Sequence, residues 1–99
     1  MIEVRETAAF SDWLSGLRDH RAKARIAARV RRLAHGNPGD VAPIGEGVSE
    51  LRIHAGPGYR VYFVRRGAAL IVLLAGGDKN SQVQDIKTAK ALAQSLKEG

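Results

Sequence analysis

The sequence predicts one α+β domain in which a small, mostly antiparallel sheet of four strands packs against a helical hairpin and a C-terminal helix, in the order β-α-α-β-β-β-α. Apolar side chains recur at helical spacing in two segments near the N-terminus and in one at the C-terminus. Between them, three runs with strand-like patterns follow one another across glycine-containing turns. With 99 residues, the chain has room for a single hydrophobic core.

The first part of the chain predicts a strand and a helix. Residues 2–5 alternate apolar and polar side chains, which is typical of a short strand. Either Thr7 or Ser11 can cap the helix that follows. Its buried stripe has i, i+3, i+4 and i+7 spacing and consists of Phe10, Trp13, Leu14 and Leu17.

A break at residues 19–20 separates this helix from a second one, which we expect from about Arg21 to Leu33. Its inner face consists of Ala22, Ile26, Val30 and Leu33. Gly36 follows as a C-terminal cap, and Pro38 prevents the helix from continuing. The segment 37–47 is rich in Gly and Pro and is predicted to be a loop.

The remaining chain predicts three strands and a helix. The strands are separated by turns at residues 56–58 and 66–67, and they span residues 49–55, 59–65 and 69–75. Residues 70–74 are apolar without alternation, so this strand should be central, with both faces at least partly covered. A last helix is expected to begin near Ser81. Its apolar face consists of Ile86, Ala89, Leu92, Ala93 and Leu96.

The composition excludes several classes of protein. Sixteen Lys and Arg residues against ten Asp and Glu give a net charge of +6, which suits a polyanionic partner, either nucleic acid or an acidic protein. There is no cysteine and the three histidines lack metal-ligand spacing, so we expect neither a metal nor a cofactor. No apolar run approaches the roughly 20 residues of a membrane span, and the acidic N-terminus does not resemble a signal peptide. We therefore expect a cytoplasmic protein that binds no membrane.

The second predicted helix carries an unusual concentration of positive charge. Seven of the sixteen cationic residues lie between residues 18 and 32, and no acidic residue occurs between Arg21 and Arg32, so ion pairs within the helix cannot neutralise them. The segment is either a solvated helix face or a surface that meets phosphates without reading base sequence. The candidates for nucleic-acid binding are Arg18, Arg21, Lys23, Arg25, Arg29 and Arg32.

The hairpin that follows carries further cations on one face. A side-chain period of two directs Leu51 and Ile53 toward the core. The same period directs Glu50, Arg52 and His54 outward. The polar face of this hairpin is therefore expected to be almost entirely basic.

Later residues extend this basic face. Arg60 and Tyr62 on the next strand should lie beside the outward row. The glycines at 76–77 allow a close approach of the backbone, after which Lys79 is delivered to the end of the sheet. Asp85 can return to the same place, or it can simply complement the N-terminus of the last helix.

Such a cluster suits chemistry on a phosphodiester. We expect Arg52, Arg60 and Lys79, joined by His54 or Asp85, to converge on one concave surface. Metal-free RNA cleavage needs a base for the attacking 2′-OH, cations for the charge of the phosphorane and an acid for the departing 5′-oxygen. His54 suits the role of base or acid, and Lys79 can transfer a proton because neighbouring cations depress one another's pKa.

Several residues also have a purely structural interpretation. Trp13 belongs to a helical stripe and is expected to be a core residue rather than a platform for bases. Tyr59 or Tyr62 can stack a base, although packing is the alternative for Tyr62. His20 and His35 are expected to be surface residues.

The runs ELRIHAGPGYRVYF and LIVLLAGGDKNSQVQDIKTAKAL resemble the RelE/ParE toxin superfamily. More narrowly, they resemble its HigB-like addiction module killer proteins, which belong to bacterial type II toxin–antitoxin systems. The resemblance covers essentially the whole chain, and its specific motifs are GPGYR, GGDK and QxxDI. It implies a RelE-like fold and a ribosome-dependent, metal-independent mRNA endonuclease that inhibits translation. It also implies that the partners are the ribosome, mRNA and a cognate antitoxin protein with a DNA-binding domain.

The resemblance also implies roles for single residues. Arg60 matches the family's phosphate-stabilising arginine, and Arg52 matches a basic residue that serves in proton transfer. Lys79 falls where ribosome-dependent members place a cation on the acid side of the reaction. Asp85 falls near a position where some members carry a tyrosine. Since no tyrosine follows residue 62, that role is vacant here, and His54 is the residue available to fill it.

Two other functions stay open at this point. ParE-like members of the superfamily inhibit DNA gyrase and lack the nuclease cluster, and a basic nucleic-acid-binding module would need no catalysis. Substitution of Arg52, Arg60 and Lys79 separates these functions, because only the nuclease should depend on all three. Since Arg60 is expected to point outward from a strand, Arg60→Ala should abolish toxicity and leave the fold intact.

Overall fold

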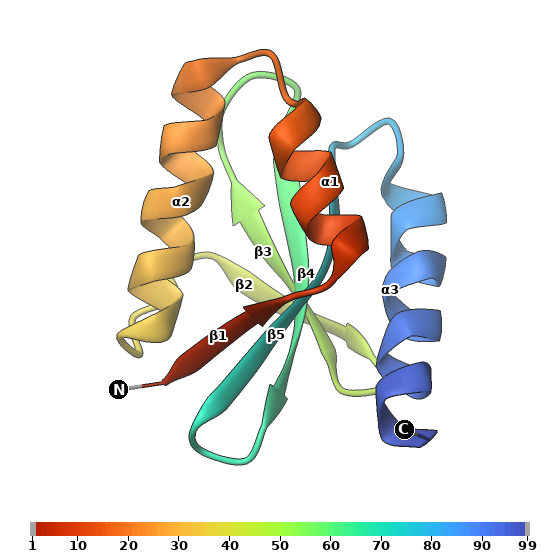
Figure 1. The fold of residues 1–99 in the computed structure, drawn as a ribbon. Coiled ribbons are helices and arrows are strands. Elements are labelled where there is room, and N and C mark those ends of the chain that lie inside the picture. The colour runs from red at the N-terminus through yellow and green to blue at the C-terminus, as the bar shows by residue number, and fades with distance from the viewer. Residues whose placement is uncertain (1, 99) are drawn as a thin grey trace.

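The structure is a computed structural model that describes residues 2–98. A five-stranded sheet with the strand order β1-β5-β4-β3-β2 lies between two helical layers, as Figure 1 shows. Helices α1 and α2 cover one face, and α3 covers the other. The elements in chain order are β1 (Glu3–Glu6), α1 (Ala8–Gly16), α2 (His20–Ala34), β2 (Val41–Gly45), β3 (Val48–Ile53), β4 (Tyr59–Arg66), β5 (Leu70–Gly77) and α3 (Gln82–Glu98). Within residues 2–98, no helix is long and apolar enough to cross a membrane.

The fold class is α+β as predicted, but the sheet has five strands instead of four, and it is mixed. β1 pairs with β5 in parallel, whereas the other neighbouring pairs are antiparallel. The additional strand is β2, which lies inside the segment 37–47 that was predicted to be a loop. Pro43 and the surrounding glycines hide its strand pattern. A proline is tolerated there because β2 is an edge strand that pairs only with β3.

The predicted helix boundaries are confirmed to within a residue or two. Thr7, rather than Ser11, caps α1, and its side chain accepts a hydrogen bond of 3.1 Å from the backbone N–H of Phe10. Asp19 caps α2 by accepting the N–H groups of Arg21 and Ala22. Gly36, which follows the end of α2, has a φ of +83° and so supplies the left-handed residue on which helices commonly end.

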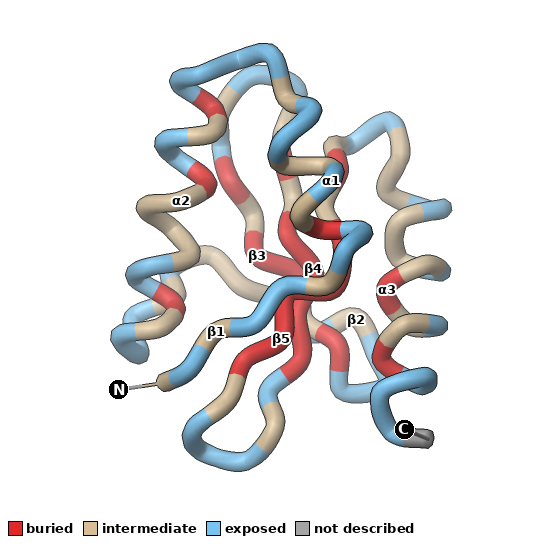
Figure 2. Tube along the Cα trace, in the orientation of Figure 1, coloured by how far each residue is buried: buried red, intermediate tan, exposed pale blue. Residues whose placement is uncertain are grey.

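Two hydrophobic clusters lie on opposite faces of the sheet, and Figure 2 shows the buried positions gathered on its inner strands. The cluster beneath α1 and α2 includes Phe10, Ile26, Leu33, Leu51, Val61, Phe63, Ile71 and Leu73. The cluster beneath α3 includes Val48, Tyr62, Val64, Val72, Leu74, Ala89 and Ala93. The burial of alternate β5 residues in each cluster confirms that both faces of this strand are covered.

The expectation that the polar face of the β3–β4 hairpin is open to solvent is wrong for two residues. Glu50 retains 1% of its exposed area and Tyr62 retains none, because α3 covers this face of both strands. The side chain of Arg52, farther along β3, keeps 41% of its exposed area. The alternation of side chains along the hairpin was predicted correctly, but the sequence pattern does not reveal that a helix lies over part of the polar row.

The two glycines at the end of β5 allow side chains to pack directly on the backbone from both faces. A Cβ atom at Gly76 would overlap the ring of Trp13, which packs against the core as predicted. A Cβ atom at Gly77 would overlap the Asp85 carboxylate. The close approach that the Gly76–Gly77 pair permits is therefore made by the protein's own α1 and α3.

We expect Gly76→Ala and Gly77→Ala to lower the melting temperature, because the added methyl group has no room. Overpacking of this kind costs about 1–3 kcal/mol, and each kcal/mol lowers Tm by roughly 4–8 °C in a domain of this size. Gly16→Ala is the matched control, since nothing lies within 4 Å of its Cβ position apart from its chain neighbours and the backbone of its own helix. Thermal unfolding followed by circular dichroism measures the difference, and equal melting temperatures in all three variants would contradict the packing described.

Candidate functional site

A cleft with a volume of about 510 Å³ opens at the end of the β3–β4 hairpin. It brings together four of the five predicted catalytic residues, and their side chains share the lining with Asp40. The four residues are Arg52, His54, Arg60 and Lys79. Asp85 does not line the cleft.

The sheet and the β3–β4 turn position the three cations. Arg52 and Arg60 lie directly opposite each other in the antiparallel register of β3 and β4. Lys79 comes from the connection between β5 and α3, and the stem of its side chain lies over Gly58 in the turn. A Cβ at Gly58 would come within 2.9 Å of the Lys79 side chain, so this glycine gives the lysine its place beside the arginines.

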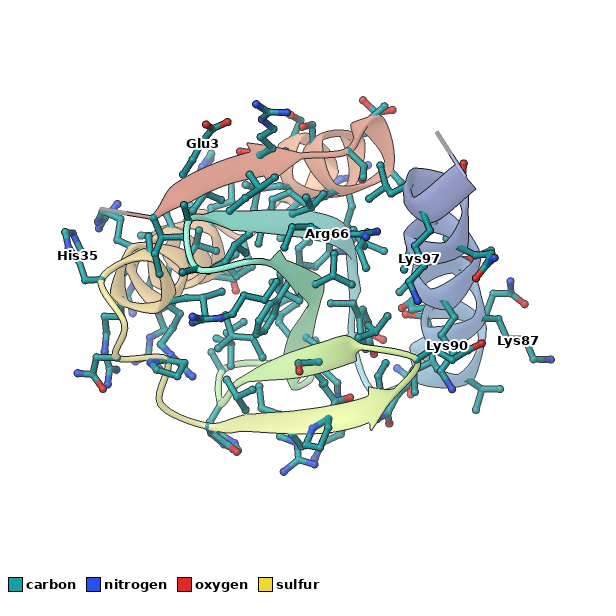
Figure 3. All side chains as sticks on the ribbon, turned by 90° about the horizontal axis from the view of Figure 1, so that it is seen from below. Glu3, His35, Arg66, Lys87, Lys90 and Lys97 are labelled. Atoms are coloured by element: carbon teal, nitrogen blue, oxygen red, sulfur yellow. The ribbon has the colours of Figure 1, made fainter. Side chains whose placement is uncertain are left out.

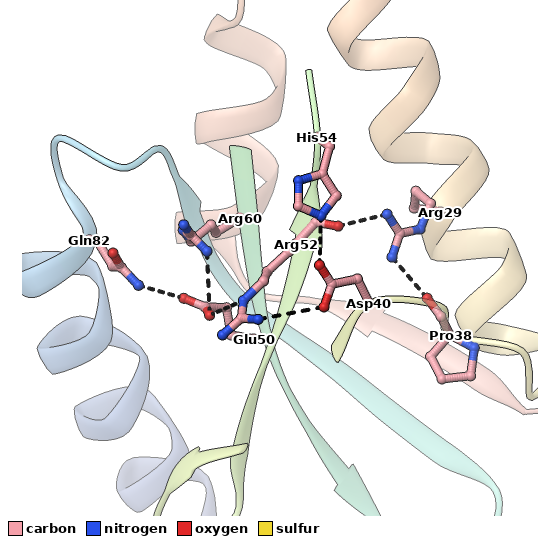
Figure 4. A network of polar contacts seen from close by, with 8 residues as sticks. All are labelled: Arg29, Pro38, Asp40, Glu50, Arg52, His54, Arg60 and Gln82. Atoms are coloured by element: carbon pink, nitrogen blue, oxygen red, sulfur yellow. Dashed lines mark hydrogen bonds and ion pairs between the residues drawn. The ribbon is translucent and has the colours of Figure 1, made fainter. Parts of the chain in front are cut away.

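Glu50 lies behind the two arginines and connects them, as Figure 4 shows. Its Oε2 atom is 3.0 Å from Nε of Arg52 and 3.4 Å from the nearer terminal nitrogen of Arg60. Its Oε1 atom accepts a hydrogen bond of 2.8 Å from Nε2 of Gln82 on α3. Like charges directly opposite each other in a sheet repel, and the shared carboxylate offsets that repulsion.

The Glu50 contacts affect the two arginines differently. The hydrogen bond from Arg52 to Glu50 raises the pKa of the Arg52 guanidinium above its ordinary value. The side chain of Arg60 is only 13% exposed, and its buried Nε has no hydrogen-bond partner among the described residues. Arg60 is thus a nearly buried cation with one donor free, oriented by a carboxylate at the base of an open cleft.

Asp40 forms the other side of the cleft and is in contact with both Arg52 and His54. Its Oδ2 atom is 2.6 Å from Nε2 of His54, and its Oδ1 atom is 3.6 Å from a terminal nitrogen of Arg52. The hydrogen bond with His54 is the main reason that the pKa of Asp40 lies below its usual value. Sequence reasoning did not identify Asp40 or Glu50 as residues of the site. Since both carboxylates contact its cationic side chains, the hairpin face is not almost entirely basic.

The remaining predicted residues of the hairpin and of α3 have structural contacts. Asp85 lies in the first turn of α3 and accepts a hydrogen bond of 2.5 Å from Ser81 Oγ, which fits its structural interpretation. Tyr62 is fully buried, and burial raises the pKa of its phenol. Its ring cannot stack a base, so packing is its role. Tyr59 is 8% exposed and lines the cleft. Its ring packs edge-on against that of Trp13, with 6.3 Å between the ring centroids.

The basic residues of α2 fall into two groups. Arg29 fixes the chain around it, because it donates hydrogen bonds of 2.6 Å to the carbonyl of Arg52 and 3.0 Å to that of Pro38. Lys23 donates to the carbonyl of Ser15. The other predicted binders are exposed, and one of them, Arg25, also donates a hydrogen bond of 3.4 Å to the carbonyl of His54. They are Arg18, Arg21, Arg25 and Arg32.

Three of these exposed arginines line a basic face that continues from the cleft. Arg21 and Arg25 border a depression beside the β3–β4 turn. Arg25 and Arg32 border a second depression that reaches His54. Within residues 2–98, no group of three or more His, Asp or Glu side chains is placed to hold a metal ion.

Two comparisons with known proteins bear on this cleft. Residues 12–97 match the family described as "Phage derived protein Gp49-like (DUF891)". A protein of Haemophilus influenzae described as "Uncharacterized protein" is 50% identical to the chain over 95 residues, which are 96% of each of the two chains. Both matches include every segment that builds the cleft.

Arg60→Ala is expected to lower the stability of the fold, which revises the expectation from sequence. The substitution removes one of the two guanidinium partners of the buried Glu50 carboxylate, and a buried charge that loses a partner costs about 1–3 kcal/mol. Arg65→Ala, at an exposed position of the same strand, is the matched control. Chemical denaturation of both variants measures the difference. If the two variants are equally stable, Arg60 is not needed to neutralise Glu50.

Proposed function

Because the chain belongs to the Gp49-like family, a family of RelE-like toxins associated with toxin–antitoxin systems, we propose that it is a HigB-like toxin that cleaves mRNA on the ribosome without a metal ion. The observation that carries this proposal is the meeting of three cations and a histidine in one open cleft. Cleavage of RNA by its own 2′-OH needs charge stabilisation and two proton transfers, and these residue types can supply both.

Arg52 and Arg60 would hold the scissile phosphate. Both guanidiniums are oriented by Glu50 before any substrate arrives, so little reorganisation is needed when charge develops on the phosphorane. Because Nε of Arg60 is buried, a phosphate in the cleft would be met by the terminal nitrogens of this guanidinium. Together with Lys79, the arginines outnumber the carboxylates of Asp40 and Glu50, which leaves a net positive charge for a phosphodiester.

His54 and Lys79 would transfer the protons. The imidazole of His54 lies at the edge of the cleft and accepts the proton of the attacking 2′-OH. Lys79 is exposed on the opposite element and donates a proton to the departing 5′-oxygen. Because the cleft is open, the alignment of the 2′-OH with its phosphate must come from mRNA that the ribosome already holds in place.

The exposed arginines of α2 would contact further phosphates of RNA. Arg21, Arg25 and Arg32 continue the positive surface from the cleft along the groove between α2 and β3. Contacts of this kind position a substrate without reading its sequence. Arg29 is excluded from this role because its guanidinium is occupied by two backbone carbonyls.

The family also implies a cognate antitoxin as a partner. A net charge of +6 and the cationic cleft favour an acidic antitoxin segment that lies over the cleft and keeps RNA out.

Lys79→Ala is expected to abolish RNA cleavage without loss of stability, because Lys79 is exposed and has no ion pair among the described residues. The experiment is induced expression in a bacterial host, with transcript 5′ ends mapped before and after induction. Lys87→Ala is the matched control, since Lys87 points away from the sheet on the outer side of α3 (Figure 3).

The pattern of new RNA ends decides between the functions. Ends within translated frames that appear with the wild type and Lys87→Ala, but not with Lys79→Ala, support a ribosome-dependent nuclease. Growth arrest without new ends points to an inhibitor of a protein target such as gyrase. If growth continues with no new ends, the chain is a binding module and the proposal is wrong.

The triple variant Arg21→Ala/Arg25→Ala/Arg32→Ala is expected to bind ribosomes more weakly and with a smaller dependence on salt. Each lost phosphate contact should reduce the slope of log K against log salt by about 0.7–0.9. The variant Arg65→Ala/Lys87→Ala/Lys97→Ala removes the same charge from exposed positions away from the α2 face. Sedimentation of the protein with ribosomes at several salt concentrations compares the two. Equal slopes would show that net charge, and not the α2 surface, governs binding.

A further inference from the structure

We propose that Asp40 is a positioning residue that makes His54 a proton acceptor through Nδ1. The proposal rests on the function proposed above and names the group and the atom that begin the reaction. Asp40 and His54 are distant in the sequence: Asp40 directly precedes β2, and His54 directly follows β3. The pairing of the edge strand β2 with β3 brings them together.

The position of Asp40 is fixed by several contacts on both sides. Its backbone carbonyl accepts a hydrogen bond of 2.9 Å from the N–H of Arg52, which extends the β2–β3 ladder by one bond. Two residues earlier, the carbonyl of Pro38 accepts from Arg29, and the same guanidinium also holds the carbonyl of Arg52. The Asp40 carboxylate is therefore carried by a segment that α2 and β3 clamp from two directions.

The contact between the two side chains determines which nitrogen of His54 carries the proton. A carboxylate can only accept hydrogen bonds, so Nε2 of His54 must be the donor over the 2.6 Å that separate it from Oδ2 of Asp40. In the neutral imidazole, the lone pair then lies on Nδ1. Figure 4 shows the Nδ1 edge of the ring on the side of the network where Arg60 lies, away from Arg29.

The surroundings keep Asp40 ionised, which this role requires. The charged groups that face it are His54 and Arg52 from β3 and its end, and Arg29 from α2. All three lower the pKa of the carboxyl, and the hydrogen bond from His54 has the largest effect. Asp40 is thus a carboxylate at neutral pH, and it can stabilise the positive charge that forms on the ring when Nδ1 takes up a proton.

The step balances without any further reactant. The 2′-OH transfers its proton to Nδ1 of His54 while its oxygen forms a bond to the adjacent phosphorus, and the bond from phosphorus to the 5′-oxygen breaks. Lys79 gives a proton to that 5′-oxygen. The products are a 2′,3′-cyclic phosphate and a 5′-hydroxyl. Afterwards His54 releases its proton to water, and Lys79 takes up a proton from water.

Kinetics of defined variants test the pair. Purified ribosomes programmed with a short mRNA supply the substrate, and the rate of cleavage is measured over a range of toxin concentrations. A general base contributes typically 10²–10⁴-fold, so His54→Gln should lower the saturating rate about a hundredfold or more. Asp40→Asn, which removes the charge but keeps the shape, should lower it roughly tenfold to a hundredfold, with little change in the half-saturating concentration.

A double-mutant cycle separates an effect through His54 from one through Arg52, which Asp40 also meets at 3.6 Å. If Asp40 acts through His54, adding Asp40→Asn to His54→Gln changes the rate by less than about twofold. A loss as large in that background as in the wild type means that Asp40 acts through Arg52 or the fold, and it overturns the proposal. Thermal unfolding of each variant checks that the fold is retained.

A second measurement does not depend on cleavage. Long-range ¹H–¹⁵N spectra of His54, recorded where the ring is neutral, should show the proton on Nε2 in the wild type. A proton on Nδ1 overturns the proposal whatever the kinetics. The two proposals are contradicted by different results. If the wild-type protein cleaves no RNA, both proposals are wrong. If His54→Gln cleaves RNA as fast as the wild type, only the role of the Asp40–His54 pair is wrong.

Discussion

The buried carboxylate of Glu50 organises the cleft. It holds the guanidiniums of Arg52 and Arg60, which stand opposite each other on neighbouring strands, and it ties both strands to Gln82 on α3. A carboxylate with 1% of its area exposed is tolerated only when it is paired and hydrogen-bonded, and Glu50 has two guanidinium partners and one amide donor. The stability of the sheet and the geometry of the cleft therefore depend on the same contacts. A change to either arginine alters both at once.

The cleft is also shaped by close approaches of the backbone. Gly58 admits the stem of Lys79, and the Gly76–Gly77 pair admits Trp13 from one face and Asp85 from the other. These contacts fix the end of β5, the start of α3 and the β3–β4 turn relative to one another. Of the cleft cations, Lys79 is the one positioned in this way, because its stem lies against the backbone of the β3–β4 turn, and a preformed position of this kind favours phosphate recognition.

Much of the fold could be predicted from the sequence, because its signals are local. Apolar periodicity located the three helices, and the unbroken run in β5 correctly indicated a strand covered on both faces. β2 was missed because Pro43 and the flanking glycines resemble a loop, and only pairing with β3 makes the segment a strand. Glu50 and Tyr62 were placed on a solvated face because a period of two cannot reveal that α3 lies over one end of it.

The candidate site likewise contains residues that local patterns could predict and residues that they could not. Four side chains that converge in the cleft were identified from motifs, since their strands and turns have clear signatures. The carboxylates that organise them were not, for different reasons. Asp40 belongs to the segment without a visible pattern, and Glu50 was counted as one charge in a basic row. Whether a charge is solvated or buried between two others depends on tertiary packing, which no local pattern encodes.

The parallel pairing of β1 with β5 has a consequence for how the chain is made. Glu3 is aligned with Leu70, so the first strand synthesised has no partner until most of the chain has left the ribosome. Lys79 and Gln82, the α3 residue that donates to Glu50, are synthesised later still. A nascent chain that ends before β5 and Lys79 therefore has neither the β1–β5 pair nor a complete cleft.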